Sequence, residues 1–332
     1  MSKMLKSLGL VAMLALVLVL AACGSDSEEG TDGEDSNNGE EQQENAEGSN
    51  GEESESDSEG SSEEENAQVG EGKEIELVYV EWDSEVASTN VVGQVLKNLG
   101  YDVTVTPIDN AVMWQSVASG DADAMVAAWL PATHGDLHAE YKDQLVDLGE
   151  NLTGAKIGLV VPTYMEDVTS ISDLSNYAED LDQKITGIEP GAGVVKAAES
   201  AVETYPALEG WQVETSSSGA MATALGEAID NEEPIVVTGW TPHWKFAEYD
   251  LKYLEDPEKS FGEAEVIKTM ARQGLEEDLP NAYKILDQFS WESADMEEVM
   301  LEIQNGADPA EAAAAWVEEN QDKVSKWTEG VE

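Results

Sequence analysis

The stretch IELVYVEW at residues 75–82 is an apolar, strand-like run that stops at a tryptophan. Its β-branched and aromatic residues favour an extended strand. Two further apolar runs end in the same way, MVAAW at residues 125–129 and PIVVTGW at residues 234–240. In an open α/β sheet, ligands bind beyond the carboxyl ends of the strands. The three tryptophans are therefore expected at one shared binding edge.

Helical patterns alternate with these strands and predict an α/β fold. After the first strand, Val91, Val95 and Leu99 recur at helical spacing, with Ser88-Thr89 as the expected cap. The chain from Asn281 onward is expected to be all helical. Strands are expected at residues 75–80, 102–105, 125–129, 157–161, 184–188, 211–214 and 234–240.

The two halves of this pattern are alike, which predicts two lobes. Trp82 lies 47 residues before Trp129, and Ile188 lies 52 residues before Trp240. Two α/β lobes of similar build that face each other are the simplest explanation of this spacing.

The first 22 residues are expected to be a signal peptide. Lys3 and Lys6 precede an apolar run at residues 8–20, which is too short for a mature transmembrane helix. The following Leu-Ala-Ala-Cys resembles the lipobox of bacterial lipoproteins and makes Cys23, the only cysteine of the chain, the expected lipidation site. An ordinary signal peptide with a chance cysteine is the alternative.

Residues 23–72 are expected to be a lipidated cysteine followed by a disordered acidic tether. Residues 24–72 contain 19 Asp or Glu and no Lys, Arg or aromatic residue, so they cannot bury enough surface to fold. The remaining chain has 52 acidic and 14 basic residues. This charge excludes nucleic acid as a partner and disfavours an anionic membrane surface. We interpret it as a solvated surface suited to high salt or high pH.

Three indole faces at one edge are typical of a site for a quaternary ammonium group. Such a group has no N–H to donate, whereas each aromatic face contributes roughly 0.5–2 kcal/mol when desolvated. Micromolar binding needs about 8 kcal/mol, so the other end of the ligand must be held too. Two features could hold an anion there. One is the strand and glycine-rich turn at residues 186–193, alternatively a plain turn, and the other is His134, alternatively a surface histidine.

These residues together resemble a known family. EWDSE at residues 81–85, AWLP at residues 128–131 with His134, GIEPG at residues 187–191 and TGWTPHW at residues 238–244 are similar to motifs of the glycine betaine-binding proteins of osmoprotectant ABC importers. The resemblance covers essentially all of residues 73–332. It implies that Trp82, Trp129 and Trp240 surround the trimethylammonium group. It also implies that backbone amides of Gly187 and Ile188, together with His134, bind the carboxylate.

The resemblance also implies the two-lobed periplasmic-binding-protein fold of the type II kind, with the ligand cleft between the lobes. We expect one lobe at residues 73–160 plus 266–332 and the other at residues 161–265. The expected ligands are glycine betaine and proline betaine, and the expected partners are the permease and ATPase subunits of an ABC transporter. The protein should be a monomer, anchored by its lipid to the extracytoplasmic face of the cell membrane.

Other classes of protein fit the pattern less well. The chain contains neither G-x-S-x-G nor H-E-x-x-H, and its one cysteine is expected to be lipidated, so we predict no enzyme activity and no cofactor or metal. A choline- or carnitine-type binding protein would use the same aromatic cage. A lipid-anchored sensor on the same fold is the remaining alternative.

Overall fold

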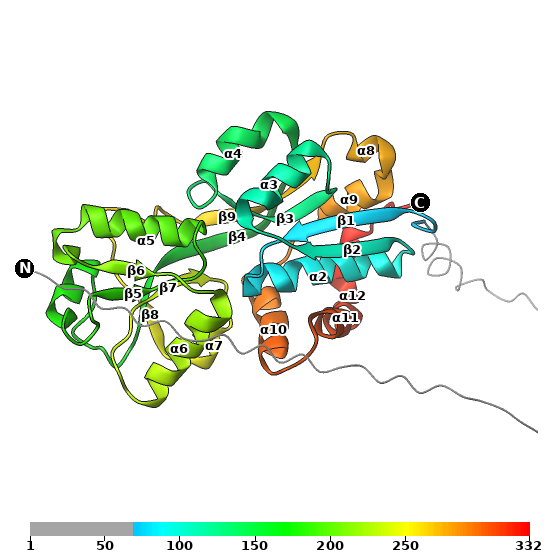
Figure 1. Cartoon of the computed structure of the whole chain (residues 1–332). Coiled ribbons are helices and arrows are strands. Elements are labelled where there is room, and N and C mark those ends of the chain that lie inside the picture. The colour runs from blue at the N-terminus through cyan, green and yellow to red at the C-terminus, as the bar shows by residue number, and fades with distance from the viewer. Residues whose placement is uncertain (1–68) are drawn as a thin grey trace, which may run out of the picture. The chain divides into compact units, whose positions relative to one another are not determined.

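The computed structural model describes residues 69–332 of the chain (Figure 1). The predicted signal peptide, Cys23 and nearly all of the predicted tether lie outside this range. Residues 69–72 lie inside it and form a turn, in which the Gly70 N–H donates to the Leu99 carbonyl at 2.9 Å. Residues 69–72, the end of the predicted tether, are thus bonded to the folded part through this turn.

A mixed sheet forms the first half of the fold. Its strand order is β2-β1-β3-β9-β4, with β1, β2 and β3 parallel and β9 antiparallel to both of its neighbours. Every residue of β3 is buried, as expected for a central strand covered on both faces. The strands are β1 (Glu74–Tyr79), β2 (Asp102–Pro107), β3 (Ala124–Leu130), β4 (Leu145–Pro162) and β9 (Glu265–Arg272).

A second sheet of the same build continues from the long strand β4 (Figure 1). β4 pairs with β9 up to Ala155 and with β7 from Lys156 onward, so its two ends belong to different sheets. The order here is β4-β7-β5-β6, and β8 also pairs with β4. Each half thus carries a parallel triplet beside an antiparallel strand, which confirms the predicted internal likeness. The strands are β5 (Lys184–Thr186), β6 (Gln212–Glu214), β7 (Val237–Thr241) and β8 (Leu251–Tyr253).

Helices cover both faces of the first sheet. α2 (Asp83–Asn98) packs on one face against α10 (Ser293–Gln304) and α11 (Pro309–Glu319), and α3 (Asn110–Ser119) lies on the other (Figure 1). The predicted cap at Ser88-Thr89 is wrong, because α2 begins at Asp83 and both residues are buried inside the helix. The remaining helices of the central region are α4 (Gly135–Tyr141), η1 (Lys142–Gln144), η2 (Ile171–Tyr177), α5 (Gly193–Thr204), η3 (Pro206–Leu208), α6 (Ser218–Asp230) and α7 (Lys245–Glu248).

The C-terminal segment is helical, as its pattern predicts. Trp316 packs against Trp291 and Trp327 there, with ring centroids 5.7 and 5.9 Å apart, so these tryptophans serve the core. Across residues 69–332, no helix combines the length and the apolar character that a membrane crossing requires. The helices are α8 (Leu275–Asp278), α9 (Pro280–Gln288), α10 (Ser293–Gln304), α11 (Pro309–Glu319) and α12 (Gln321–Trp327).

Candidate ligand-binding site

The fold brings the three predicted tryptophans together. Trp82 follows β1 and immediately precedes α2, Trp129 lies near the end of β3, and Trp240 lies near the end of β7. Two of these strands belong to the first sheet and one to the second. The tryptophans therefore meet where the carboxyl ends of parallel strands from both sheets face each other.

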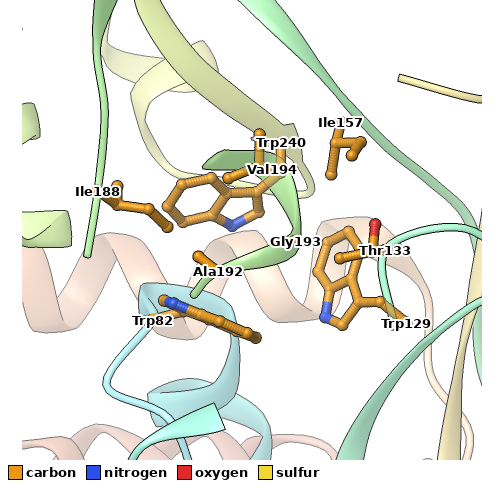
Figure 2. Close-up of a pocket in the computed structure, with 9 residues that line it drawn as sticks. All are labelled: Trp82, Trp129, Thr133, Ile157, Ile188, Ala192, Gly193, Val194 and Trp240. Carbon is orange, nitrogen blue, oxygen red and sulfur yellow. The ribbon is translucent and has the colours of Figure 1, made fainter. Parts of the chain in front are cut away.

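The three indoles wall a small apolar cavity (Figure 2). Figure 2 shows Trp240 and Trp82 above and below one space, with Trp129 to the side. Their side chains are held firmly, since all three residues are at most 6% exposed. The residues that line the cavity are Trp82, Trp129, Thr133, Ile157, Ile188, Ala192, Gly193, Val194 and Trp240.

Hydrogen bonds fix the orientation of each indole. The Trp129 Nε1–H donates to Glu85 at 2.6 Å within the first sheet's half of the fold. The other two bonds cross between the halves: Trp82 donates to Glu189 at 2.5 Å, and Trp240 donates to Ser84 at 3.2 Å. The geometry of the aromatic walls is therefore tied to the contact between the two halves.

Asp83 adds a second connection between the halves, beside the cavity. From the start of α2, its carboxylate accepts the Ser218 hydroxyl and the Trp244 indole N–H, both at 2.6 Å. His243 Nε2 lies 3.4 Å from the same carboxylate. Burial alone would raise the pKa of Asp83, but the nearby His243 and the hydrogen bonds from Ser218 and Trp244 outweigh it and hold that pKa well below its usual range. The carboxylate is therefore ionised at neutral pH.

The anion end of the site differs from the prediction at Gly187. Gly187 does not line the cavity, and its N–H already donates to the Glu214 carbonyl at 2.9 Å as part of the sheet. Ile188 does line the cavity. Gly193 and Val194 line it as well, at the first turn of α5, where N–H groups have no partner within the helix. Ala192, at the cap position, makes no side-chain cap bond, so the first-turn amides of Gly193 and Val194 are available to an anion.

Gly193 also marks a close approach of the two halves at the cavity. A Cβ atom on Gly193 would lie 2.4 Å from the Thr133 carbonyl oxygen and 2.4 Å from its Cγ2 atom. A backbone oxygen cannot rotate away as a side chain can. Only glycine at this position lets the start of α5 reach the loop that follows β3.

His134 is buried beside the cavity rather than in its lining. Its ring stacks on Trp82 with the centroids 5.6 Å apart, and its Nδ1 accepts the Trp129 backbone N–H at 3.1 Å. Burial lowers the pKa of His134 to about 3, so the ring is neutral at physiological pH. Because Nδ1 is an acceptor, the proton sits on Nε2, which has no hydrogen-bond partner among the described residues. His134 lines an adjoining cavity that shares Thr133 and Gly193 with the aromatic one.

Lys245 lies against the Trp240 ring and is unusual because its amino group is buried. The residue is completely buried, and its Nζ has no hydrogen-bond partner within residues 69–332. The Nζ atom lies 4.1 Å from the Trp240 ring centroid, a cation–π distance. Burial lowers the pKa of Lys245 from 10.5 to about 7, and Asp83 acts in the opposite direction.

Replacing Lys245 with methionine is expected to stabilise the protein most at acidic and neutral pH. Between pH 7 and pH 10.5 the unfolded chain keeps a proton on Lys245 that the folded chain has released. Unfolding then takes up a proton, so the lysine's contribution to the free energy of unfolding rises with pH across this window. We expect Lys245→Met to exceed the wild type by on the order of 5 kcal/mol near pH 6, as the lowered pKa implies, and to lose this advantage toward pH 10.5.

Urea unfolding of both proteins at several pH values measures this difference. Lys156→Met is the matched control, because Lys156 also sits over an aromatic ring, 4.3 Å from the Tyr253 centroid, but is exposed to solvent. A gap between wild type and Lys245→Met that stays constant with pH would contradict the buried charge at Lys245.

The prediction from sequence thus placed four of its six ligand residues in the cavity lining. Gly187 and His134 lie outside the lining, and His134 lines the adjoining cavity instead. Gly193 closes the glycine-rich stretch that was predicted to hold an anion, and it lines the cavity together with Val194. Nothing in the sequence marks Thr133 and Ile157 as lining residues, because small and apolar residues near a strand end are ordinary in any α/β protein.

Two α/β sheets that share a strand, with an aromatic cavity where they meet, define a two-lobed substrate-binding protein. The chain belongs to the family described as the substrate binding domain of ABC-type glycine betaine transport systems (OpuAC), which matches residues 73–319. That family serves transport rather than catalysis.

Individual relatives agree with this assignment. A lactococcal OpuAC structure, closed and complexed with glycine betaine, has 53% sequence identity and a TM-score of 0.74, over 77% of this chain and 100% of that one. An ABC-transporter choline binding protein in complex with choline has 30% identity and a TM-score of 0.72, over 78% and 92% of the two chains. The glycine betaine/carnitine transport binding protein GbuC of Listeria monocytogenes is 51% identical over 155 residues, 46% of this chain. The match spans only 52% of that relative's length.

Proposed function

We propose that this protein captures glycine betaine, and also proline betaine, for uptake by an ABC importer. The observation that carries the proposal is the pairing of two unlike surfaces in one cavity: three buried indoles and the uncapped first turn of a helix. A zwitterion with a quaternary ammonium at one end and a carboxylate at the other matches both.

The indoles of Trp82, Trp129 and Trp240 would hold the ammonium group. Each desolvated face contributes roughly 0.5–2 kcal/mol, so three faces supply only part of the affinity. The Gly193 and Val194 N–H groups would bind the carboxylate, where the dipole of α5 favours negative charge. The neutral His134 ring would add its Nε2–H as a donor, which suits a carboxylate and no part of a trimethylammonium group.

Closure around the ligand would couple binding to transport. Because β4 changes partner between Ala155 and Lys156, we place the first hinge there, five residues before the boundary expected from sequence. One lobe is then residues 73–155 plus 266–332 and the other residues 156–265. A ligand that touches both lobes favours the closed state by its differential affinity, and the closed state would dock on the permease. The protein would act as a monomer, anchored through lipidated Cys23 at the extracytoplasmic membrane face.

Choline is an alternative ligand that would fit this site less well than glycine betaine. Choline would fill the indole cage but would leave the amides at the start of α5 and the His134 Nε2–H without an acceptor, and unpaired buried donors are costly. Carnitine keeps the carboxylate but separates it further from the ammonium group. A lipid-anchored sensor would bind the same ligands without serving import.

A tryptophan-fluorescence titration of the purified protein with glycine betaine, proline betaine, carnitine and choline tests the proposal. We expect saturable binding of both betaines and at least about 10-fold weaker binding of choline, because choline lacks the carboxylate. Choline bound as well as glycine betaine would remove the carboxylate clamp. Loss of betaine uptake after deletion of the gene would separate the importer from the sensor.

A further inference from the structure

Each of the three indole N–H groups leads to a carboxylate behind the cavity. Trp129 donates to Glu85 Oε1 at 2.6 Å, and Trp82 donates to Glu189 Oε1 at 2.5 Å. Trp240 donates to the Ser84 hydroxyl at 3.2 Å, and that hydroxyl donates in turn to Glu85 Oε2 at 2.5 Å. Two glutamates therefore terminate all three hydrogen-bond chains, although neither lines the cavity.

Such bonds change the electrostatics of an indole face. A hydrogen bond to a carboxylate is charge-assisted and stronger than one between neutral groups. It draws electron density from the N–H toward the ring, and successive hydrogen bonds polarise one another in the same direction. The face of the ring is what attracts a cation, so a more negative face binds it more tightly.

Burial makes this effect larger at Glu85 than at Glu189. Glu85 is completely buried, whereas Glu189 is only partly buried. Charges in a region of low dielectric interact more strongly and are less screened by salt. Glu85 also serves two indoles, one directly and one through Ser84, and these indoles come from different halves of the fold.

We propose that Glu85 and Glu189 form an anionic layer behind the indole cage that selects a cationic headgroup over an uncharged group of the same shape. The layer acts through the tryptophans and does not touch the ligand, so both glutamates are positioning and specificity residues. This inference rests on the proposed function, because it assumes that the cage receives a quaternary ammonium group.

The test compares two ligands that differ only in charge at the headgroup. Glycine betaine carries a trimethylammonium group. The anion 3,3-dimethylbutanoate (tert-butylacetate, not the ester) carries a tert-butyl group of the same shape beside the same carboxylate. Burial raises the pKa of Glu85 to about 7, so the titrations are run at about pH 8.5, where the carboxylate is ionised. Glu85→Gln removes the charge but keeps an oxygen that can accept the Trp129 N–H.

We expect Glu85→Gln to weaken glycine betaine binding by about 10-fold or more and to leave tert-butylacetate binding within about twofold of the wild type. Glu189→Gln should change the same ratio in the same direction by less. Glu298→Gln is the matched control, since Glu298 accepts the Trp316 indole N–H at 3.1 Å far from the cavity. It should change neither affinity.

Two outcomes would overturn the proposal. Equal losses for both ligands in Glu85→Gln would mean that Glu85 only holds the tryptophans in place. Unchanged affinity for both would mean that the layer has no influence on the cage. Failure of the wild type to bind glycine betaine at all would instead reject the proposed function, so the two failures are distinguishable.

Discussion

Replacing Gly193 with alanine is expected to weaken glycine betaine binding by at least about 100-fold, or roughly 2.7 kcal/mol. The added Cβ would lie 2.4 Å from the Thr133 carbonyl oxygen, which belongs to the backbone and cannot move alone. The two halves of the fold would then be held apart at the cavity, and the amides at the start of α5 would not reach the ligand. Isothermal titration with glycine betaine measures the loss.

Gly135→Ala is the matched control for this substitution. Gly135 is also the first residue of a helix, but nothing lies within 4 Å of the position where its Cβ would be. This variant should bind like the wild type. Thermal unfolding without ligand should be similar for both variants, because open halves relieve the clash at Gly193. Wild-type affinity in Gly193→Ala would show that closure does not need this approach.

Replacing Trp129 with alanine is expected to weaken glycine betaine binding by about 10- to 1,000-fold while the protein still folds. The substitution removes one wall of the cage and leaves the buried Glu85 carboxylate without its indole donor. Isothermal titration calorimetry measures the change. It replaces the fluorescence titration because the variant lacks a tryptophan of the site.

Trp129→Phe separates the aromatic face from the hydrogen bond. It keeps a π face and loses the N–H bond to Glu85, so its affinity should lie between those of the wild type and Trp129→Ala. Trp316→Phe, in the C-terminal aromatic cluster, should leave binding unchanged. If Trp129→Ala bound glycine betaine as tightly as the wild type, Trp129 would have to be removed from the site.

The alternation of strands and helices could be predicted from the sequence because apolar residues follow a different spacing in each kind of element. β3 is a continuous apolar run, and α2 repeats its apolar residues Val91, Val92, Val95 and Leu96 at helical spacing. The tryptophans at strand ends were readable for a related reason. Chain order and the parallel arrangement together send the ends of such strands to one edge of a sheet.

The first part of β4 carried no such signal. Residues 145–155 bury Leu145, Leu148 and Leu152 at a spacing of three or four, not the alternation of a regular strand. Register shifts against β9 explain this spacing, because each irregularity moves the next side chain to the other face.

A sequence also does not show which backbone amides are available to bind an anion. Gly187 and Gly193 lie in one glycine-rich stretch, and either could offer an N–H to an anion. Pairing with β6 uses the N–H of Gly187, whereas the start of α5 leaves that of Gly193 available. The partner of each backbone N–H is known only once the neighbours in space are known.

Local pattern was sufficient for the class of fold, the internal likeness of its halves and the aromatic character of the site, because these depend on residue type and spacing along the chain. Packing in three dimensions decided the rest: the start of α2, the close approach at Gly193 and the glutamates behind the indoles. Those features join residues up to 156 positions apart, as Ser84 and Trp240 do. No periodicity along a single chain can encode such a contact, because it exists only once the two halves have come together.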